Sequence, residues 1–197
     1  MRNREKIIKL ILDNDGIILR KDLEKLNIPS IYLTILVKEK ALDRIGWGVY
    51  VAVNFFEDDF FKTQVASKYA VYSNNTALYL HGLSNRTPIK YDITLPYNYN
   101  GSLMSNKNVN IFRVNKLVLN LGIIDMKSPG GKNIRVYDKE RTICDIIKNK
   151  NKIDNEIVNE AIKKYVASGS FDIYKLKKYA KLLNLENKVN KYLEVLL

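Results

Sequence analysis

Apolar residues recur every three to four positions through the first forty residues of the chain, which is the spacing of one buried face of an α-helix. The pattern predicts helices over 2–13 and 20–26, an extended piece at 17–19, and a third helix that begins near Pro29. One face of the third helix is apolar and contains Tyr32, Leu33, Leu36 and Val37. The opposite face carries the small polar, aliphatic and basic side chains Ser30, Ile31, Thr34, Ile35 and Lys38. A helix with one packed face and such an outward face suits the major groove of DNA.

Two extended runs follow the third helix and are joined by glycines. They span 41–45 and 49–51, and the bend between them is Gly46-Trp47-Gly48. A helix followed by a hairpin of this kind is the arrangement of a winged helix-turn-helix. The sequence therefore predicts a reader of DNA in which Arg44 and Trp47 on the wing touch the backbone or the minor groove beside the third helix.

The aliphatic residues on the outward face leave a second interpretation open. Ile31 and Ile35 could equally pack against the second domain, and helix-turn-helix shapes also serve as protein docking modules. A pure docking module would bind no DNA, so a DNA titration separates the two interpretations.

An aromatic and then acidic run at 54–59 separates this segment from the rest of the chain. We predict a winged helix-turn-helix DNA-binding domain over 1–54, a linker over 55–61 and a second domain over 62–197. The pattern then predicts helices over 60–70 and 75–83, and strands over 91–95, 109–114, 121–126 and 134–137. Four helices follow, over 141–148, 155–167, 173–183 and 186–196. The predicted fold class is α/β (α+β): after the winged helix-turn-helix, a mixed domain with a small antiparallel sheet and a helical C-terminal half.

The chain is strongly basic, with 33 Lys and Arg against 21 Asp and Glu and a formal net charge of +12. Such an excess favours nucleic acid or another acidic partner. Most of the excess lies in residues 101–197, which carry 19 basic and 10 acidic side chains, and not in the predicted reader. It is either the solvated surface of ordinary helices or a face that follows DNA phosphates beyond the groove contact.

Few residues are available for redox, metal or membrane functions. Cys144 is the only cysteine and His81 the only histidine, which excludes an internal disulfide and a His-based metal cluster and disfavours a structural zinc site. We interpret Cys144 as a small core residue and His81 as a residue at the C-terminal end of a helix. No apolar run reaches the ~18 residues that span a bilayer, and a signal-peptide core is absent. We therefore expect a cytoplasmic protein with no membrane partner, no metal and no cofactor.

One pattern favours an enzyme instead. Asp92 and the run Asp125-Met126-Lys127 lie in predicted strands, and two carboxylates on neighbouring strands with a nearby lysine are typical of metal-dependent nucleases. The carboxylates would hold Mg²⁺, and Lys127 would stabilise the attacking water or the developing charge. The Asp-x-Lys string is short, however, and occurs by chance in lysine-rich proteins. A DNA-binding protein with a nuclease second domain is therefore the alternative to a protein without catalytic residues.

Three stretches of the chain resemble a known family. Residues 42–50 (LDRIGWGVY), with the upstream Gly16-Ile17-Ile18, are similar to the winged-helix domain of AbiEi-like antitoxins. Residues 73–83 (SNNTALYLHGL) and 137–145 (YDKERTICD) resemble two recurring motifs of that family's second domain. Taken together and in this order, the three stretches cover most of the chain.

The resemblance implies a transcriptional autorepressor and antitoxin of a type IV toxin–antitoxin system of the abortive infection kind. Its first domain would bind double-stranded DNA at inverted repeats in its own promoter. Its second domain would neutralise a nucleotidyltransferase-like toxin encoded next door, in phage defence, with direct contact between the two left open. Members of the family are not known as enzymes, so the resemblance also implies no catalytic activity.

In residues 137–145, Glu140 and Arg141 lie at the start of a predicted helix that directly follows a strand. A carboxylate near a helix N-terminus is favoured by the helix dipole. We predict a structural role here, in which an ion pair of Arg141 with an acidic neighbour ties the helix to the sheet.

Overall fold

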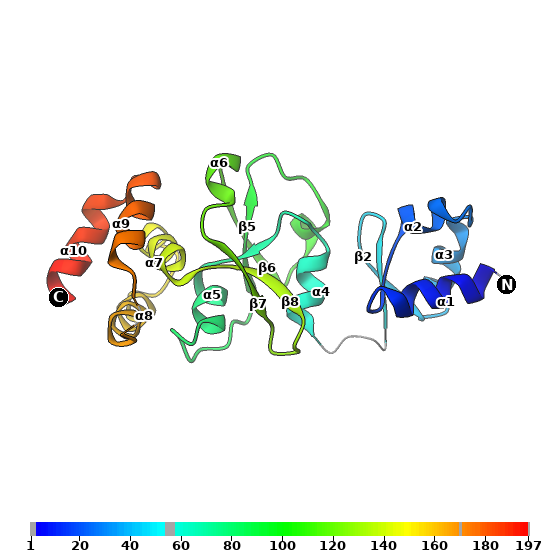
Figure 1. Ribbon diagram of the computed structural model, residues 1–197, viewed down its shortest axis with the longest axis horizontal. Helices are drawn as coiled ribbons and strands as arrows, with labels where there is room; N and C mark the ends of the chain where they lie inside the picture. Colours follow the sequence, from blue (N-terminus) through cyan, green and yellow to red (C-terminus); the bar gives the residue numbers. More distant parts are fainter. Residues whose placement is uncertain (1–2, 54–57, 170, 197) are drawn as a thin grey trace. The chain divides into compact units, whose positions relative to one another are not determined.

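The computed structural model describes residues 3–53, 58–169 and 171–196 (Figure 1). The chain divides into two compact units. The first unit contains residues 1–68 together with 100–106 and 127–134, and the second unit contains 69–99, 107–126 and 135–197. The predicted boundary at 54–59 falls mainly on residues 54–57, which lie outside the described residues.

The first unit begins with the winged domain, by which we mean residues 3–53. Its elements are α1 (Asn3–Asp13), β1 (Ile17–Leu19), α2 (Arg20–Lys25), α3 (Ile31–Lys38), β2 (Leu42–Gly46) and β3 (Val49–Ala52). The three strands form a sheet in which β3 lies in the centre, antiparallel to both β1 and β2. The predicted winged helix-turn-helix is therefore confirmed.

The sequence pattern accounts for the core of this domain. The buried cluster consists of Ile7, Ile18, Leu23, Ile28, Leu33, Leu36, Leu42 and Tyr50. Tyr32 and Val37 are partly buried against this cluster, so the apolar face predicted for α3 is the packed one. Full burial of one such side chain contributes about 1.5–3 kcal/mol. This burial decides which side of α3 faces outward.

The next helix, α4 (Asp59–Val65), is shorter than the helix predicted over 60–70. The buried Asp58 caps its first turn, because the Asp58 carboxylate accepts a hydrogen bond from the backbone N–H of Phe61 at 3.1 Å. The same carboxylate accepts a hydrogen bond from the Ser128 hydroxyl. Asp58 therefore joins two segments of the first unit that are distant in sequence.

The other five strands form one sheet with the order β6-β5-β4-β8-β7. They are β4 (Val71–Tyr72), β5 (Tyr91–Pro96), β6 (Val109–Val114), β7 (Ile123–Lys127) and β8 (Asn133–Tyr137). Strand β4 runs antiparallel to β5 but parallel to β8, and β5 runs parallel to β6. The prediction of an antiparallel sheet is therefore wrong, and the sheet is mixed. Its central strand, β4, has two residues, too few for an alternating pattern to reveal it.

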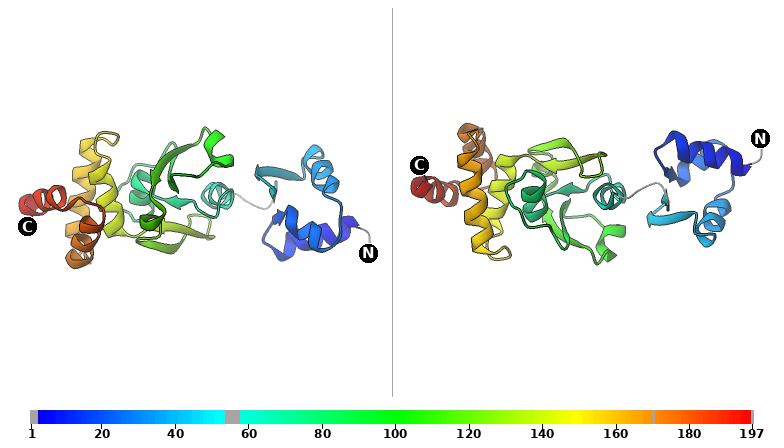
Figure 2. Two further views of the ribbon diagram at one scale, coloured as in Figure 1. Left: turned by 90° about the horizontal axis from the view of Figure 1, so that it is seen from above. Right: turned by 90° about the horizontal axis from the view of Figure 1, so that it is seen from below.

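Helices make up most of the second unit after the sheet. α5 (Asn74–Leu80) follows β4, and the short η1 (Ser102–Ser105) and α6 (Lys116–Leu119) are two helical turns that the pattern did not predict. The C-terminal half contains α7 (Lys139–Lys148), α8 (Asn155–Ala167), α9 (Ile173–Leu182) and α10 (Glu186–Leu196), close to the four predicted helices. Figure 2 shows these helices grouped together, coloured from yellow to red. Their facing sides bury one apolar cluster with Leu78 of α5.

Candidate nucleic-acid interface

The outward side of α3 carries the side chains that the sequence predicted for DNA contact. Ile31 is 57% exposed and Ile35 is 40% exposed, which are large fractions for aliphatic residues. Thr34 and Lys38 are also exposed, and Ser30 is partly exposed at the N-cap without a side-chain capping hydrogen bond. Hydroxyl groups, aliphatic groups and a cation are the groups that contact base edges, thymine methyls and phosphates in a major groove.

The turn before α3 sets the direction of the helix. Asn27 adopts a left-handed φ of +54°. Beyond this turn, the Ile28 N–H donates a hydrogen bond to the Leu23 carbonyl at 2.9 Å. Leu33 and Leu36 then point into the core at 0% and 6% exposure. Rotation of α3 about its axis would expose these leucines, so the core holds the outward face in place.

The wing is a tight hairpin with Trp47 at its tip. Gly46 pairs with Val49 across the hairpin, which leaves Trp47 and Gly48 as the two residues of the bend. Gly48 has a φ of +68°, a conformation that suits glycine in a two-residue bend. Trp47 is 87% exposed, whereas tryptophan is usually well buried. Its ring is therefore presented for contact outside the domain.

Arg44 lies on β2 beside an irregularity in the strand pairing. The register shifts between Arg44 and Gly46, and a bulge of this kind re-aims the neighbouring side chains. The exposed Arg44 side chain donates from Nε to the Gly46 carbonyl at 3.4 Å. A guanidinium has five N–H donors, so one long bond leaves others for a phosphate.

Two acidic side chains near this surface are paired with cations. Glu39, directly after α3, lies 2.6 Å from an Nη of Arg4. Asp43 on β2 lies 2.9 Å from the Nζ of Lys62. Pairing reduces the repulsion that these carboxylates would exert on a DNA backbone, although exposed pairs are also screened by salt.

The carboxylates proposed for a nuclease are far apart in the sheet. Asp92 lies on β5 and Asp125 on β7, and both β4 and β8 lie between these strands. Three strand spacings correspond to about 14 Å, too far for both carboxylates to bind one metal ion. The predicted neighbouring strands are therefore wrong, and the nuclease alternative loses its geometric basis. Within the described residues, no group of three or more His, Cys, Asp and Glu side chains is placed to hold a metal ion.

Asp92 instead holds the start of α5 against the sheet. Its carboxylate accepts hydrogen bonds from the backbone N–H of Asn75 at 3.0 Å and the side-chain amide of Asn110 at 2.9 Å. Its backbone N–H donates to the Thr76 hydroxyl at 2.8 Å. Burial raises the pKa of Asp92, and the hydrogen bonds from Asn110 and Asn75 oppose this rise.

The stretches 73–83 and 137–145 are in direct contact. His81 follows the last residue of α5, as interpreted from the sequence, and its Nε2 lies 2.6 Å from the carbonyl oxygen of Tyr137. Burial lowers the pKa of His81, so the neutral ring donates this hydrogen bond at neutral pH. Asn149, just after α7, donates from its amide to the Asn74 side chain at 2.9 Å. The two stretches therefore form one structural element.

Arg141 is completely buried where β8 leads into α7. Its Nε donates to the Asp145 carboxylate at 3.1 Å, and its Nη1 donates to the carbonyls of Val118 and Leu121 at 2.8 and 3.0 Å. The guanidinium carbon lies 4.3 Å from the centre of the Tyr137 ring. The predicted ion pair of Arg141 with an acidic neighbour is confirmed, but it lies within α7, because Asp145 is on the same helix. The carbonyls of Val118 and Leu121 and the ring of Tyr137 connect Arg141 to the segment around α6 and to β8.

The partners of the acidic residues at the start of α7 are not evident from the sequence. Asp138 caps the helix and also accepts a hydrogen bond from the Tyr179 hydroxyl at 3.1 Å. The Nζ of Lys175 lies 3.0 Å from Asp138 and 3.3 Å from Glu140, and the Tyr165 hydroxyl donates to Glu140 at 3.0 Å. The capping role of Asp138 was recognisable from its place before a helical pattern. The lysine and the tyrosines come from later helices, and no local pattern connects them to α7.

These features define a winged helix-turn-helix followed by a mixed α/β unit. Residues 5–53 match the family described as "Transcriptional regulator, AbiEi antitoxin". The matched segment contains every element of the winged domain except the first two residues of α1. The resemblance of the N-terminal domain to AbiEi-like antitoxins, inferred from its sequence, is therefore confirmed over residues 5–53.

The crystal structure of the RV2827C protein from Mycobacterium tuberculosis has a similar fold, with a TM-score of 0.66 and 10% sequence identity. The match covers 89% of this chain and 69% of that chain. At this identity the likeness concerns the fold alone. No curated protein matches the chain. In the part of the chain that the structure describes, no helix is both long and apolar enough to cross a membrane.

Proposed function

We propose that this chain is a DNA-binding transcriptional autorepressor and the antitoxin of a toxin–antitoxin system. The observation that carries the proposal is the exposed face of α3 beside a wing tipped by Trp47, within a domain that matches a family of transcriptional regulators. Its DNA target is a set of inverted repeats in its own promoter, as the family resemblance implies. The protein acts in the cytoplasm, where that promoter lies.

In this proposal α3 enters the major groove and each group on its face has a separate role. The hydroxyls of Ser30 and Thr34 form hydrogen bonds with base edges, and Ile31 and Ile35 contact thymine methyl groups. Lys38, at the end of the helix, contacts a phosphate. On the wing, Arg44 and Trp47 contact the adjacent backbone or the minor groove, which positions the helix.

The antitoxin activity belongs to the second unit and opposes a co-encoded nucleotidyltransferase-like toxin in phage defence. The support is the resemblance of 73–83 and 137–145 to second-domain motifs of the family, together with the hydrogen bond of His81 to Tyr137 between those stretches. The unit also has an apolar cluster of its own, so it can fold around a separate core.

A titration of promoter DNA by fluorescence anisotropy tests the DNA contacts proposed for α3. Thr34→Ala should weaken binding to the operator by about 1–3 kcal/mol, the size of one good base contact. Lys38→Ala should weaken binding to all sequences alike and lower the slope of log K against log salt by about 1. Lys9→Ala, an exposed lysine on α1, is the matched control and should change neither quantity. If Thr34 and Lys38 can both be replaced without effect, the assigned face is wrong; absence of any DNA binding would favour a docking module.

A growth assay tests whether repression and antitoxin activity reside in different parts of the chain. The toxin is induced from a separate promoter, so that altered repression cannot change its dose. The Thr34→Ala/Lys38→Ala variant should derepress the native promoter yet still protect the cells. The fragment 58–197, which keeps the bonds of Asp58 to Phe61 and Ser128, should protect without repressing. A fragment that is folded by circular dichroism but fails to protect would contradict the separation.

A further inference from the structure

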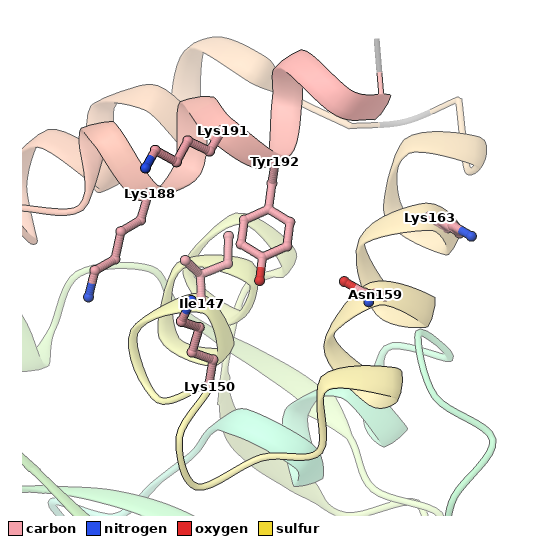
Figure 3. A pocket seen from close by; sticks show the side chains of 7 residues that line it. All are labelled: Ile147, Lys150, Asn159, Lys163, Lys188, Lys191 and Tyr192. Atoms are coloured by element: carbon pink, nitrogen blue, oxygen red, sulfur yellow. The ribbon is translucent and has the colours of Figure 1, made fainter.

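Three helices of the second unit line a half-open cavity with a basic rim. The cavity has a volume of about 550 Å³ and lies between the end of α7, α8 and α10. Its lining includes Ile147, Lys150, Asn159, Lys188, Lys191 and Tyr192 (Figure 3). Cavities of roughly 300–1,000 Å³ are the size that holds small organic ligands in proteins.

Four lysines line this cavity, and three of them lie on the same side of it. In the view of Figure 3, Lys150, Lys188 and Lys191 lie on one side of the Tyr192 ring, whereas Lys163, also in the lining, lies on the other side and points away from the ring. Within the described residues, the first three lysines form no ion pair. Several ammonium groups on one side of a cavity, without acidic partners, favour an anion that carries several charges.

The remaining walls supply apolar, aromatic and amide groups. Ile147 is 1% exposed, and Tyr192 is partly buried against the apolar cluster of the second unit. Figure 3 shows Tyr192 reaching from α10 towards Ile147, with Asn159 on the facing side of α8. An aromatic ring stacks against a nucleobase, and a side-chain amide both donates and accepts hydrogen bonds at a base edge.

We propose that this cavity binds a nucleotide with two or more phosphate groups. The base lies against Tyr192 and Ile147 with its edge at Asn159, and the phosphates lie at Lys150, Lys188 and Lys191. An acidic peptide would satisfy the lysines but would leave the aromatic and amide walls without a matching group. The nucleotide is either free or the phosphorylated end of an RNA strand. The site belongs to the second unit and is independent of the DNA reader proposed above.

Calorimetric titration of the full chain with ADP at low salt tests the proposal, with pyrophosphate and adenosine as fragment probes. ADP should bind more tightly than either fragment. Lys188→Gln/Lys191→Gln should weaken ADP binding at least tenfold. The matched pair Lys177→Gln/Lys178→Gln, exposed on α9 outside the cavity, should leave it unchanged. Tyr192→Leu should weaken binding of ADP but not of pyrophosphate, a difference that loss of folding would not produce.

Several outcomes would overturn the proposal. Pyrophosphate that binds as tightly as ADP would mean an anion site without a base. If the Lys177/Lys178 variant loses as much ADP affinity as the Lys188/Lys191 variant, ADP is bound by the diffuse charge of the surface and not by the cavity. A poly-glutamate peptide that displaces ADP and binds more tightly would identify an acidic peptide as the occupant. A comparison of ADP with a 5′-diphosphorylated RNA hexamer separates the two sources, and tighter binding of either one supports the nucleotide site.

Discussion

The winged domain and the second unit bury different kinds of side chain. Among the described residues of the winged domain, no polar or charged side chain is buried, and its core is aliphatic except for Tyr50. The second unit buries charges as well, with Asp138 and Glu140 at 6% exposure, Arg141 at 0% and Asp145 at 4%. Apolar contacts are non-directional, whereas each buried charge needs a partner in a defined position.

The difference decides where function can be sought in each region. In the winged domain the polar chemistry lies on the surface of α3 and on the wing, where it is available to a ligand. At the start of α7 in the second unit, Asp138 and Glu140 are paired with Lys175 and tyrosine hydroxyls. The Nη1 of Arg141 donates to backbone carbonyls, while its Nη2 is buried without a hydrogen-bond partner among the described residues. These groups hold helices together and leave ligand binding to other surfaces, such as the basic cavity.

The largest effect should follow from breaking the buried pair of the second unit. Arg141→Met leaves the Asp145 carboxylate buried without its cation and should lower the free energy of unfolding by about 3–5 kcal/mol. Arg86→Met, which removes an exposed pair with Glu156, should cost about 0–1 kcal/mol. Urea unfolding followed by circular dichroism measures both. The double variant Arg141→Met/Asp145→Leu should recover part of the lost stability. If Arg141→Met and Arg86→Met lower the free energy of unfolding equally, the buried pair contributes no more than the exposed one.

In the winged domain, the two faces of α3 should respond differently to the same kind of truncation. Leu33→Ala opens a cavity in the apolar core and should cost about 2–5 kcal/mol of stability. Ile31→Ala on the exposed face should change stability by less than about 0.5 kcal/mol and weaken DNA binding instead. Unfolding curves and promoter titrations of both variants provide the measurements. Loss of stability in both variants to the same extent would mean that Ile31 is part of the packing.

A smaller effect, dependent on pH, should be confined to the second unit. Burial lowers the pKa of His81 in the folded chain below its ordinary value of 6.5. The unfolded chain therefore binds the proton first as pH falls, and the free energy of unfolding should decrease below pH 6.5 by at most about 1.4 kcal/mol per pH unit. Unfolding at pH 7.5 and pH 5.5 measures the effect. His81→Gln should remove this pH dependence of the free energy of unfolding. If the variant keeps the same pH dependence, groups other than His81 cause it.

The smallest expected effect concerns the basic charge outside the reader. Residues 101–197 carry 19 basic and 10 acidic side chains. If this charge follows DNA phosphates, fragment 1–60 should bind the operator more weakly than the whole chain, with a shallower dependence of log K on log salt. Equal slopes for the fragment and the whole chain would mean that the charge is only solvated surface.

Local pattern was sufficient for the winged domain and for the long helices. Leu33 and Leu36 lie three residues apart on one helix, and the glycines of the wing are separated only by Trp47, so their arrangement depends on neighbours along the chain. For the same reason α8 and α10 have the bounds that periodicity predicts. The exposed positions of Ile31 and Ile35 follow from the burial of the opposite face.

Tertiary structure alone decided the strand order and the sites that depend on it. Asp92 and Asp125 looked like partners because each lies in a strand, but β4 and β8 separate them in the sheet. The approach of Lys175 to Asp138, and of α10 lysines to Ile147, joins residues about forty positions apart in sequence. Pairing of distant segments depends on how the whole core closes, and no periodicity within a single segment encodes it.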